Sequence, residues 1–175
     1  MNNKINVLLS EEQVDARIAE LGAQISKEYE GEEIFMICTL KGACFFACEL
    51  AKRITVPVAL DFMSVSSYVN SYVSSGKIIM KKDLEESIVG KNVIVVEDIV
   101  DTGRTLSYLM DNLKQRGPKS LKLCAMLDKP DRRVVDIKAD YTGFEIPDLF
   151  VIGYGLDYAQ RYRNLPYIGV LEVEE

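Results

Sequence analysis

The sequence predicts an α/β protein with a mostly parallel twisted sheet flanked by helices. Short apolar runs alternate with segments of helical periodicity through the middle of the chain, which is typical of a parallel sheet covered by helices on both faces. Residues 93–96 read Val-Ile-Val-Val, as expected of a strand that is buried on both faces. The length of 175 residues favours a single domain over residues 1–175.

The first predicted element is a helix over residues 11–29. Ser10 and Gln13 have the spacing of a capping box, in which each side chain binds the backbone N–H of the other residue. Apolar residues then recur at helical spacing, namely Val14, Ile18, Leu21 and Ile25. The next elements are expected to be a strand at 34–38, a helix at 43–53 and a strand at 58–65.

Residues 66–77 change character, because they are polar, rich in serine and contain two tyrosines. A loop of this length inside a compact domain is usually functional or disordered. We therefore expect a long loop here, with a return to strand at 78–80.

The second half of the chain repeats the alternation. The strand at 93–96 is expected to end at Glu97 and Asp98. A helix face follows it at Leu106, Leu109, Met110 and Leu113, and Gly117-Pro118 is typical of a helix end. The remaining elements are expected to be a strand at 121–127, an irregular segment at 141–147 and strands at 149–152 and 167–171.

Composition excludes several classes of function. The chain contains no histidine, so Ser-His-Asp catalysis and His-ligated metal sites are excluded. The net charge of −6 argues against broad nucleic-acid binding but leaves room for a phosphorylated small molecule. No apolar run is long enough to span a membrane, and the first residues lack the apolar core of a signal peptide, so we expect a cytoplasmic protein without membrane contact.

The four cysteines fit that compartment. All of them stand among apolar residues, with no Cys-x-x-Cys pair to suggest a zinc site. We interpret them as buried, reduced thiols. They are Cys38, Cys44, Cys48 and Cys124.

Residues 93–106 are the most informative segment for function. Two carboxylates, Glu97 and Asp98, follow the buried strand, and Asp101 comes three residues later, before Thr-Gly-Arg-Thr and a helix. Ligands of open α/β sheets bind where a strand feeds a helix in this way, and free N–H groups at the helix start suit a phosphate. The adjacent acids suit sugar hydroxyls or a hydrated metal ion. The plain alternative is that Asp101 is only the N-cap of the helix.

The same segment carries a resemblance to a known family. Residues 95–105 resemble the phosphoribosyl-diphosphate signature of type I phosphoribosyltransferases, and further segments in the family's order narrow the match to the hypoxanthine-guanine subfamily. These are Leu40-Lys41-Gly42, Ser67-Tyr68, Lys129-Pro130, residues 143–148 and residues 155–158. The resemblance implies a type I phosphoribosyltransferase-like fold, whose small base-binding hood is formed by the terminal segments. It also implies purine salvage, in which phosphoribosyl diphosphate and hypoxanthine or guanine give IMP or GMP and pyrophosphate.

The donors of residues 102–105 fit the 5-phosphate of the sugar, through backbone N–H groups of Thr102, Gly103, Arg104 and Thr105 and the two threonine hydroxyls. The resemblance implies that Glu97 and Asp98 face the ribose hydroxyls. It also implies that Asp101 lies near N7 of the purine as general base.

The resemblance assigns the pyrophosphate to three further segments. Lys41 and Gly42 would bind it through a loop whose Leu40–Lys41 peptide we expect to be cis, as is often the case in the family. Ser67 and Tyr68 would close over it as part of a lid that excludes water. Arg163 would donate to it, with Arg161 as a competing candidate.

The base site is implied in the last part of the chain. Lys129 would donate to the purine 6-oxygen, which selects against the amino group of adenine. Phe150 would stack on the base and Val151 would offer backbone contacts, although both fit a core strand equally well. Asp157, at the same site, would hold Mg²⁺ together with Glu97 and Asp98.

Two other interpretations stay open beside this one. A nucleotide-sensing regulator that acts on RNA or DNA could share the scaffold, and a related transferase could prefer xanthine or a pyrimidine. The expected partners of the leading interpretation are phosphoribosyl diphosphate, a 6-oxopurine and further copies of the chain in a homodimer or homotetramer.

Overall fold

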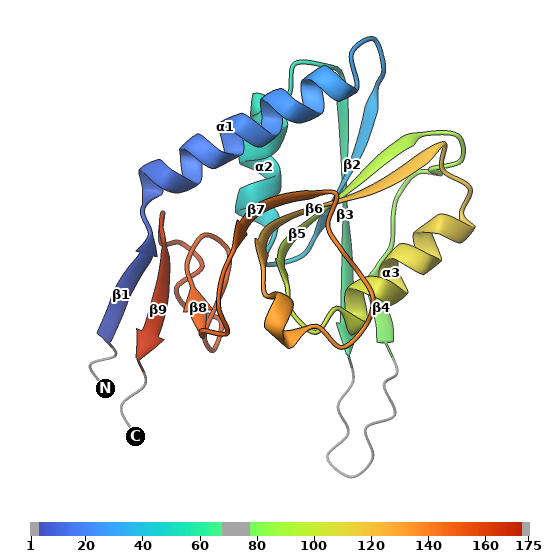
Figure 1. Cartoon of the computed structure of the whole chain (residues 1–175). Coiled ribbons are helices and arrows are strands. Elements are labelled where there is room, and N and C mark those ends of the chain that lie inside the picture. The colour runs from blue at the N-terminus through green and yellow to red at the C-terminus, as the bar shows by residue number, and fades with distance from the viewer. Residues whose placement is uncertain (1–3, 68–77, 173–175) are drawn as a thin grey trace.

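The computed structural model describes residues 4–67 and 78–172, and a six-stranded sheet forms its centre (Figure 1). The strand order is β4-β3-β2-β5-β6-β7. Neighbouring strands are parallel except for β3 and β4, so the predicted mostly parallel sheet is confirmed. The strands are β2 (Ile34–Thr39), β3 (Val58–Ser67), β4 (Ile78–Lys82), β5 (Asn92–Val100), β6 (Ser120–Asp128) and β7 (Tyr141–Glu145).

Three α-helices cover the two faces of this sheet. The helices α1 (Glu11–Glu28) and α2 (Cys44–Arg53) lie on one face and α3 (Arg104–Gln115) lies on the other (Figure 1). Because side chains alternate along a strand, each strand contributes to both layers. In β5, Ile94 and Val96 belong to the core under α1 and α2, whereas Val93 and Val95 belong to the core under α3.

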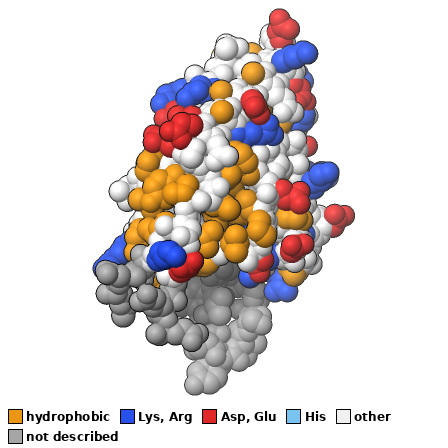
Figure 2. All heavy atoms as spheres, turned by 60° about the vertical axis from the view of Figure 1, so that its left-hand side comes forward, with side chains coloured by type: hydrophobic (Ala, Val, Ile, Leu, Met, Phe, Trp, Pro, Cys, Tyr) orange, Lys and Arg blue, Asp and Glu red, His pale blue; other side chains and the backbone are white. Residues whose placement is uncertain are grey.

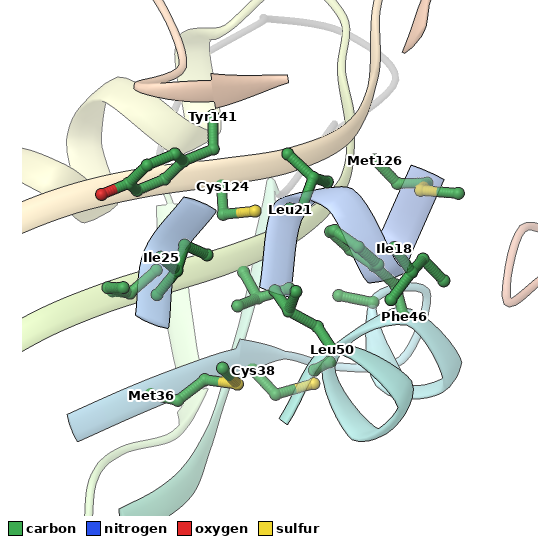
Figure 3. Close-up of a cluster of buried hydrophobic side chains, with 14 of the residues drawn as sticks. Ile18, Leu21, Ile25, Met36, Cys38, Phe46, Leu50, Cys124, Met126 and Tyr141 are labelled. Carbon is green, nitrogen blue, oxygen red and sulfur yellow. The ribbon is translucent and has the colours of Figure 1, made fainter. Parts of the chain in front are cut away.

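The larger core joins α1 and α2 to the sheet. Apolar side chains from both helices meet side chains of β2, β6 and β7 there (Figure 3). The labelled members in that view are Ile18, Leu21, Ile25, Met36, Cys38, Phe46, Leu50, Cys124, Met126 and Tyr141. The apolar spacing that predicted the first helix is thus the spacing of its buried face.

A second, three-stranded antiparallel sheet is built from the two ends of the chain. Its order is β1-β9-β8, with β1 at Lys4–Leu9, β8 at Val151–Ile152 and β9 at Ile168–Glu172. It lies beside the central sheet, below α1 in Figure 1. The terminal segments thus form a small separate sheet, at the place where the family resemblance implies the hood, although β1 itself was not predicted from the sequence.

Several boundaries differ from the predictions. Strand β5 does not end at Glu97 but continues through both acids to Val100, and β3 continues to Ser67. The segment expected to be irregular contains β7, which pairs in parallel with β6. Gly143 within β7 permits this close pairing, because a Cβ there would lie 2.3 Å from the carbonyl oxygen of Met126.

The cysteines only partly follow the prediction. Cys38 and Cys124 are buried, and burial raises the pKa of both thiols. Cys44 is half-buried, however, and Cys48 is exposed, so the prediction of burial was wrong for Cys48. All four thiols are free. Within the described residues, no helix combines the length and hydrophobicity needed to cross a bilayer.

Candidate active site

A cavity of about 280 Å³ opens where β2 and β5 end and α3 begins. This edge of an open α/β sheet is where such folds bind their ligands. The strands β2, β3 and β5 and the helix α3 supply the lining, because their ends meet at this point. The lining residues include Thr39 and Leu40 from the end of β2, Glu97 and Ile99 from β5, and Asp101, Thr102, Gly103 and Thr105 from the turn and the start of α3.

The start of α3 is left without a side-chain cap. The N-cap residue is Gly103, with φ of 81°, and the first turn contains no acidic residue. A Cβ at this position would approach Cγ2 of Ile137 to 2.5 Å, so both the backbone angle and the space favour glycine. Asp101 is therefore not the helix cap, and the N–H groups of the first turn are available to an anion in the cavity.

Glu97 and Asp98 occupy adjacent positions near the end of β5, and their carboxyls interact with each other. Glu97 lines the cavity on the α3 side. Asp98 points to the loop that precedes α2, where a Cβ on Gly42 would lie 1.5 Å from its Oδ2 atom. Burial raises the pKa of both carboxyls, and for Glu97 the neighbouring charge of Asp98 raises the pKa further. Such a pair favours a cation or hydroxyl donors nearby.

The loop after β2 packs closely against a second loop. The Leu40–Lys41 peptide is cis, as expected. Lys41 is exposed, and its ammonium donates a hydrogen bond of 3.1 Å to Oε1 of Gln160. A Cβ on Gly155 would lie 1.9 Å from the carbonyl oxygen of Gly42, so glycine is required for this contact.

The second loop, residues 153–163, contains both unusual backbone angles and a half-buried ion pair. Four residues other than glycine have positive φ there, an uncommon conformation that clusters at functional sites. They are Tyr154, Ala159, Gln160 and Tyr162. In the same loop, Arg163 pairs with Asp157 at 2.7 Å and donates to the carbonyl oxygen of Gly155 at 2.6 Å. Arg163 is half-buried and its charge acts on Asp98, whereas Arg161 is exposed, which favours Arg163 as the anion-binding arginine.

Two segments that are distant in the chain, one with Lys129 and one with Phe150 and Val151, meet at the implied base site. The side chain of Lys129 is only 9% exposed, and its ammonium donates a hydrogen bond of 2.5 Å to the carbonyl oxygen of Leu149. Phe150 follows directly and is 53% exposed, with its ring edge-on to Tyr158 at 5.8 Å between centroids. The core interpretation of Phe150 was therefore wrong, whereas Val151 is buried in β8.

Asp101 has a partner that the sequence did not suggest. Its Oδ1 atom accepts a hydrogen bond of 2.9 Å from Nε of Arg132, in the short 3₁₀ helix η1 (Pro130–Arg132). Arg132 also reaches Asp148 at 3.4 Å. Neither Arg132 nor Asp148 stood out as a site residue, because only the folded chain brings them to Asp101.

Ser67 is the last residue of β3. Tyr68 and the rest of the proposed lid to residue 77 lie outside the described residues, so their roles stay predictions.

Comparison with known proteins agrees with this geometry. Residues 6–159 match the model of the phosphoribosyl transferase domain. The hypoxanthine-guanine phosphoribosyltransferase of Bacillus subtilis is 52% identical over 166 residues, which cover 95% of this chain and 92% of that protein. The chain belongs to the hypoxanthine-guanine phosphoribosyltransferase family. A crystal structure of this family from Bacillus anthracis, with HEPES in its active site, superposes with a TM-score of 0.91 at 48% identity, covering 98% of this chain and all of that one.

A second kind of relative is much longer. The bifunctional protein TilS/HprT of Listeria monocytogenes is 53% identical over 175 residues, which cover 99% of this chain but 27% of that protein. The chain thus spans about a quarter of the length of this relative.

The side chains at the site fit the Mg²⁺ that the family implies. Mg²⁺ prefers oxygen ligands and is usually held by one or two carboxylates together with substrate phosphates and water. The described residues contain no cluster of three or more Asp, Glu, His or Cys side chains arranged to hold a metal by themselves. The adjacent, half-buried acids Glu97 and Asp98 favour a cation nearby, and Asp157 lies on the adjacent loop beside Arg163. This donor set suits a hydrated ion that is completed by the oxygens of the substrate.

Proposed function

We propose that this protein transfers the 5-phosphoribosyl group of phosphoribosyl diphosphate to hypoxanthine or guanine, which gives IMP or GMP and pyrophosphate. The observation that carries the proposal is the cavity at the end of β5. The uncapped start of α3, the half-buried Glu97 and the Asp101 carboxylate all line this cavity, and Asp98 lies beside Glu97. The phosphate, ribose, pyrophosphate and base of the substrates can each be matched to groups near this cavity.

The phosphate end of the substrate fits the start of α3. Backbone N–H groups from Thr102 to Thr105 would hold the 5-phosphate, since the helix has no cap of its own. Glu97 lines the same cavity and would face the ribose hydroxyls. The negative charge of Glu97 and Asp98 would also favour the positive charge that develops on the sugar in the transition state.

The reaction exchanges one bond at the anomeric carbon for another. The bond to the pyrophosphate oxygen breaks and its electron pair leaves with pyrophosphate, while a purine ring nitrogen forms the new bond from the opposite face. The purine loses one proton, which Asp101 would accept near N7. Lys41, Gly42 and Arg163 would hold the departing pyrophosphate, and bound Mg²⁺ would neutralise part of its charge.

Base choice would depend on the buried lysine. The ammonium of Lys129 has only donors, so it matches a purine 6-oxygen and opposes the 6-amino group of adenine. The exposed ring of Phe150 would stack on the base, with Val151 offering backbone groups beside it. These contacts favour 6-oxopurines but do not rank xanthine among them.

An assay of purified protein tests the proposal. The protein, Mg²⁺ and phosphoribosyl diphosphate are incubated with hypoxanthine, guanine, xanthine, adenine, uracil or orotate, and nucleotide formation is measured. We expect turnover of hypoxanthine or guanine and little turnover of adenine. Turnover of xanthine alone would favour the alternative specificity, and no turnover of any base would favour a nucleotide-sensing regulator on the same scaffold.

The domain organisation, cellular compartment and oligomeric state are also part of the proposal. We expect one domain over residues 1–175, in the cytoplasm, where its four free thiols would stay reduced. We also expect a homodimer or homotetramer. Hydrophobic side chains gather on the face shown in Figure 2, and exposed large residues such as Val7 and Phe45 support contacts between copies. Light scattering of the purified protein tests this assembly.

A further inference from the structure

Four side chains of alternating charge form a chain across the base end of the site. Lys129 lies 3.7 Å from Asp148, Asp148 lies 3.4 Å from Arg132, and Arg132 donates to Asp101 at 2.9 Å. The first and last members are the groups proposed for base recognition and for proton transfer. Arg132 and Asp148, which have no role in the proposed function, thus connect the two.

The backbone holds Arg132 in a fixed position relative to Asp101. The N–H of Lys129 donates to the carbonyl oxygen of Val100 at 2.9 Å, so η1 begins directly beside the end of β5. The N–H of Val134 donates to the carbonyl oxygen of Thr102 at 3.1 Å, which attaches the other end of this segment to the same turn. The two ends of the segment that carries Arg132 are therefore anchored on either side of Asp101.

The contact uses only one oxygen of the Asp101 carboxylate. Oδ1 accepts from Nε of Arg132, and within the described residues Oδ2 accepts no hydrogen bond. A carboxylate held by one oxygen keeps its orientation while the second oxygen stays available to a ring nitrogen. The flanking acids Asp101 and Asp148 raise the pKa of Arg132, so the guanidinium keeps its charge throughout the pH range of an assay.

We infer that Arg132 is a positioning residue, which aims the Asp101 carboxylate at the purine and connects it through Asp148 to Lys129. This inference rests on the proposed function. The pair should contribute little to the free energy of folding, because Arg132 and Asp101 are each 45% exposed and exposed ion pairs are weak. Its value lies in orientation, to which proton transfer is sensitive.

Kinetics of Arg132 variants test the inference. We expect Arg132→Gln to lower kcat about tenfold, a typical loss for a group that orients a reacting residue. The KM for phosphoribosyl diphosphate should stay within about twofold, because the phosphate and pyrophosphate loops are untouched. Arg132→Lys should recover much of kcat, since an ammonium can still reach the Oδ1 atom. The matched control is Lys138→Gln, which removes one positive charge from an exposed side chain further along the same segment and should leave kcat unchanged.

A double-mutant cycle tests the connection to Lys129. Asp148→Asn should raise the KM for the purine, because Lys129 loses a partner, and should lower kcat only through Arg132. The double variant Arg132→Gln/Asp148→Asn should then have the kcat of Arg132→Gln alone. Losses of kcat that multiply in the double variant would overturn the connection through Asp148.

The outcomes separate this inference from the proposed function. If the wild-type protein converts no base, the proposed function fails. If the wild-type protein is active and Arg132→Gln keeps its kcat, the positioning role is overturned and the transferase stands. A loss of kcat that follows a fall in melting temperature, with no recovery in Arg132→Lys, would show that Arg132 is structural.

Discussion

The first backbone N–H groups of a helix have no partner within the helix. The starts of α1 and α3 differ in what is available to bind these groups. At α1, Ser10 and Gln13 cap each other, and Glu11 and Glu12 stand in the first turn. At α3, the N-cap is Gly103, no side chain caps the helix and the first turn has no acid. At α1, side chains of the same segment accept hydrogen bonds from the free backbone N–H groups. At α3, these N–H groups are left for a ligand. The comparison teaches that a missing cap, beside a cavity, is a sign of a ligand site.

Asp101→Asn should give the largest effect and should affect only activity. If Asp101 accepts the purine proton, the amide cannot replace it, and kcat should fall about 100-fold or more. The melting temperature should hardly change, since Asp101 caps no helix and its ion pair is exposed. Steady-state kinetics measure kcat, and calorimetry measures binding of phosphoribosyl diphosphate, which should be largely unchanged. Equal loss of catalysis and of phosphoribosyl-diphosphate binding would show that Asp101 is structural.

Gly103→Ala should damage both stability and phosphate binding. The positive φ costs about 1–3 kcal/mol for a residue with a side chain, and the new Cβ would also meet Ile137 at 2.5 Å. Gly31→Ala is the matched control, because Gly31 has a similar φ of 78° but nothing within 4 Å of a Cβ. Thermal unfolding should show a larger loss for Gly103→Ala, and only this variant should raise the KM for phosphoribosyl diphosphate. Equal effects of the two variants would argue against a special phosphate loop.

Ser10→Ala should lower stability and leave activity unchanged, which is the opposite of the pattern expected for Asp101→Asn. Removal of a helix cap costs about 1 kcal/mol of stability, so the denaturation midpoint should fall. The kinetic constants should stay those of the wild type, because α1 starts away from the cavity. A loss of kcat in this variant, measured under conditions where the protein is folded, would contradict the separation of the two helix starts.

The smallest effect concerns pH, and it should have opposite signs at the two sites. The hydroxyl of Ser10 lowers the pKa of Glu12, so the charged form adds stability above the ordinary value of about 4.5, and this stability is lost as the pH falls. Burial raises the pKa of Glu97, so its contribution is present below about 4.5 and is lost as the pH rises. At pH 7, Glu97→Gln should therefore raise the melting temperature and Glu12→Gln should lower it. Two shifts of the same sign would show that burial does not govern Glu97.

The sequence predicted the three helices and most strands of the central sheet, because their signals are local. The capping box at Ser10 and the apolar spacing behind it required no tertiary information. Strand β1 was missed, since it becomes a strand only by pairing with β9 at the far end of the chain. Strand β7 was missed for a similar reason, because it pairs with β6 through a glycine that looks like loop sequence.

The candidate site shows the same limit. Residues of the contiguous segment 97–105 were found from their order, and the cavity brings most of them together. Arg132 and Asp148 could not be found in this way. Arg132 lies outside the segments that carry the resemblance, Asp148 only ends one of them, and their link to Asp101 exists only after folding. Phe150 shows that an apolar residue beside a buried strand can still be exposed, which the pattern alone does not reveal.

The different neighbours of Glu97 and Asp98 at the end of β5 have a mechanical consequence. Each acid stands at the margin of a different hydrophobic layer, one beside α3 and the other beside the loop that enters α2. A sugar phosphate that engages both acids would fasten the two layers together across the strand between them. Addition of the ligand should then slow hydrogen exchange at amides of α2 and at amides of α3 beyond its first turn.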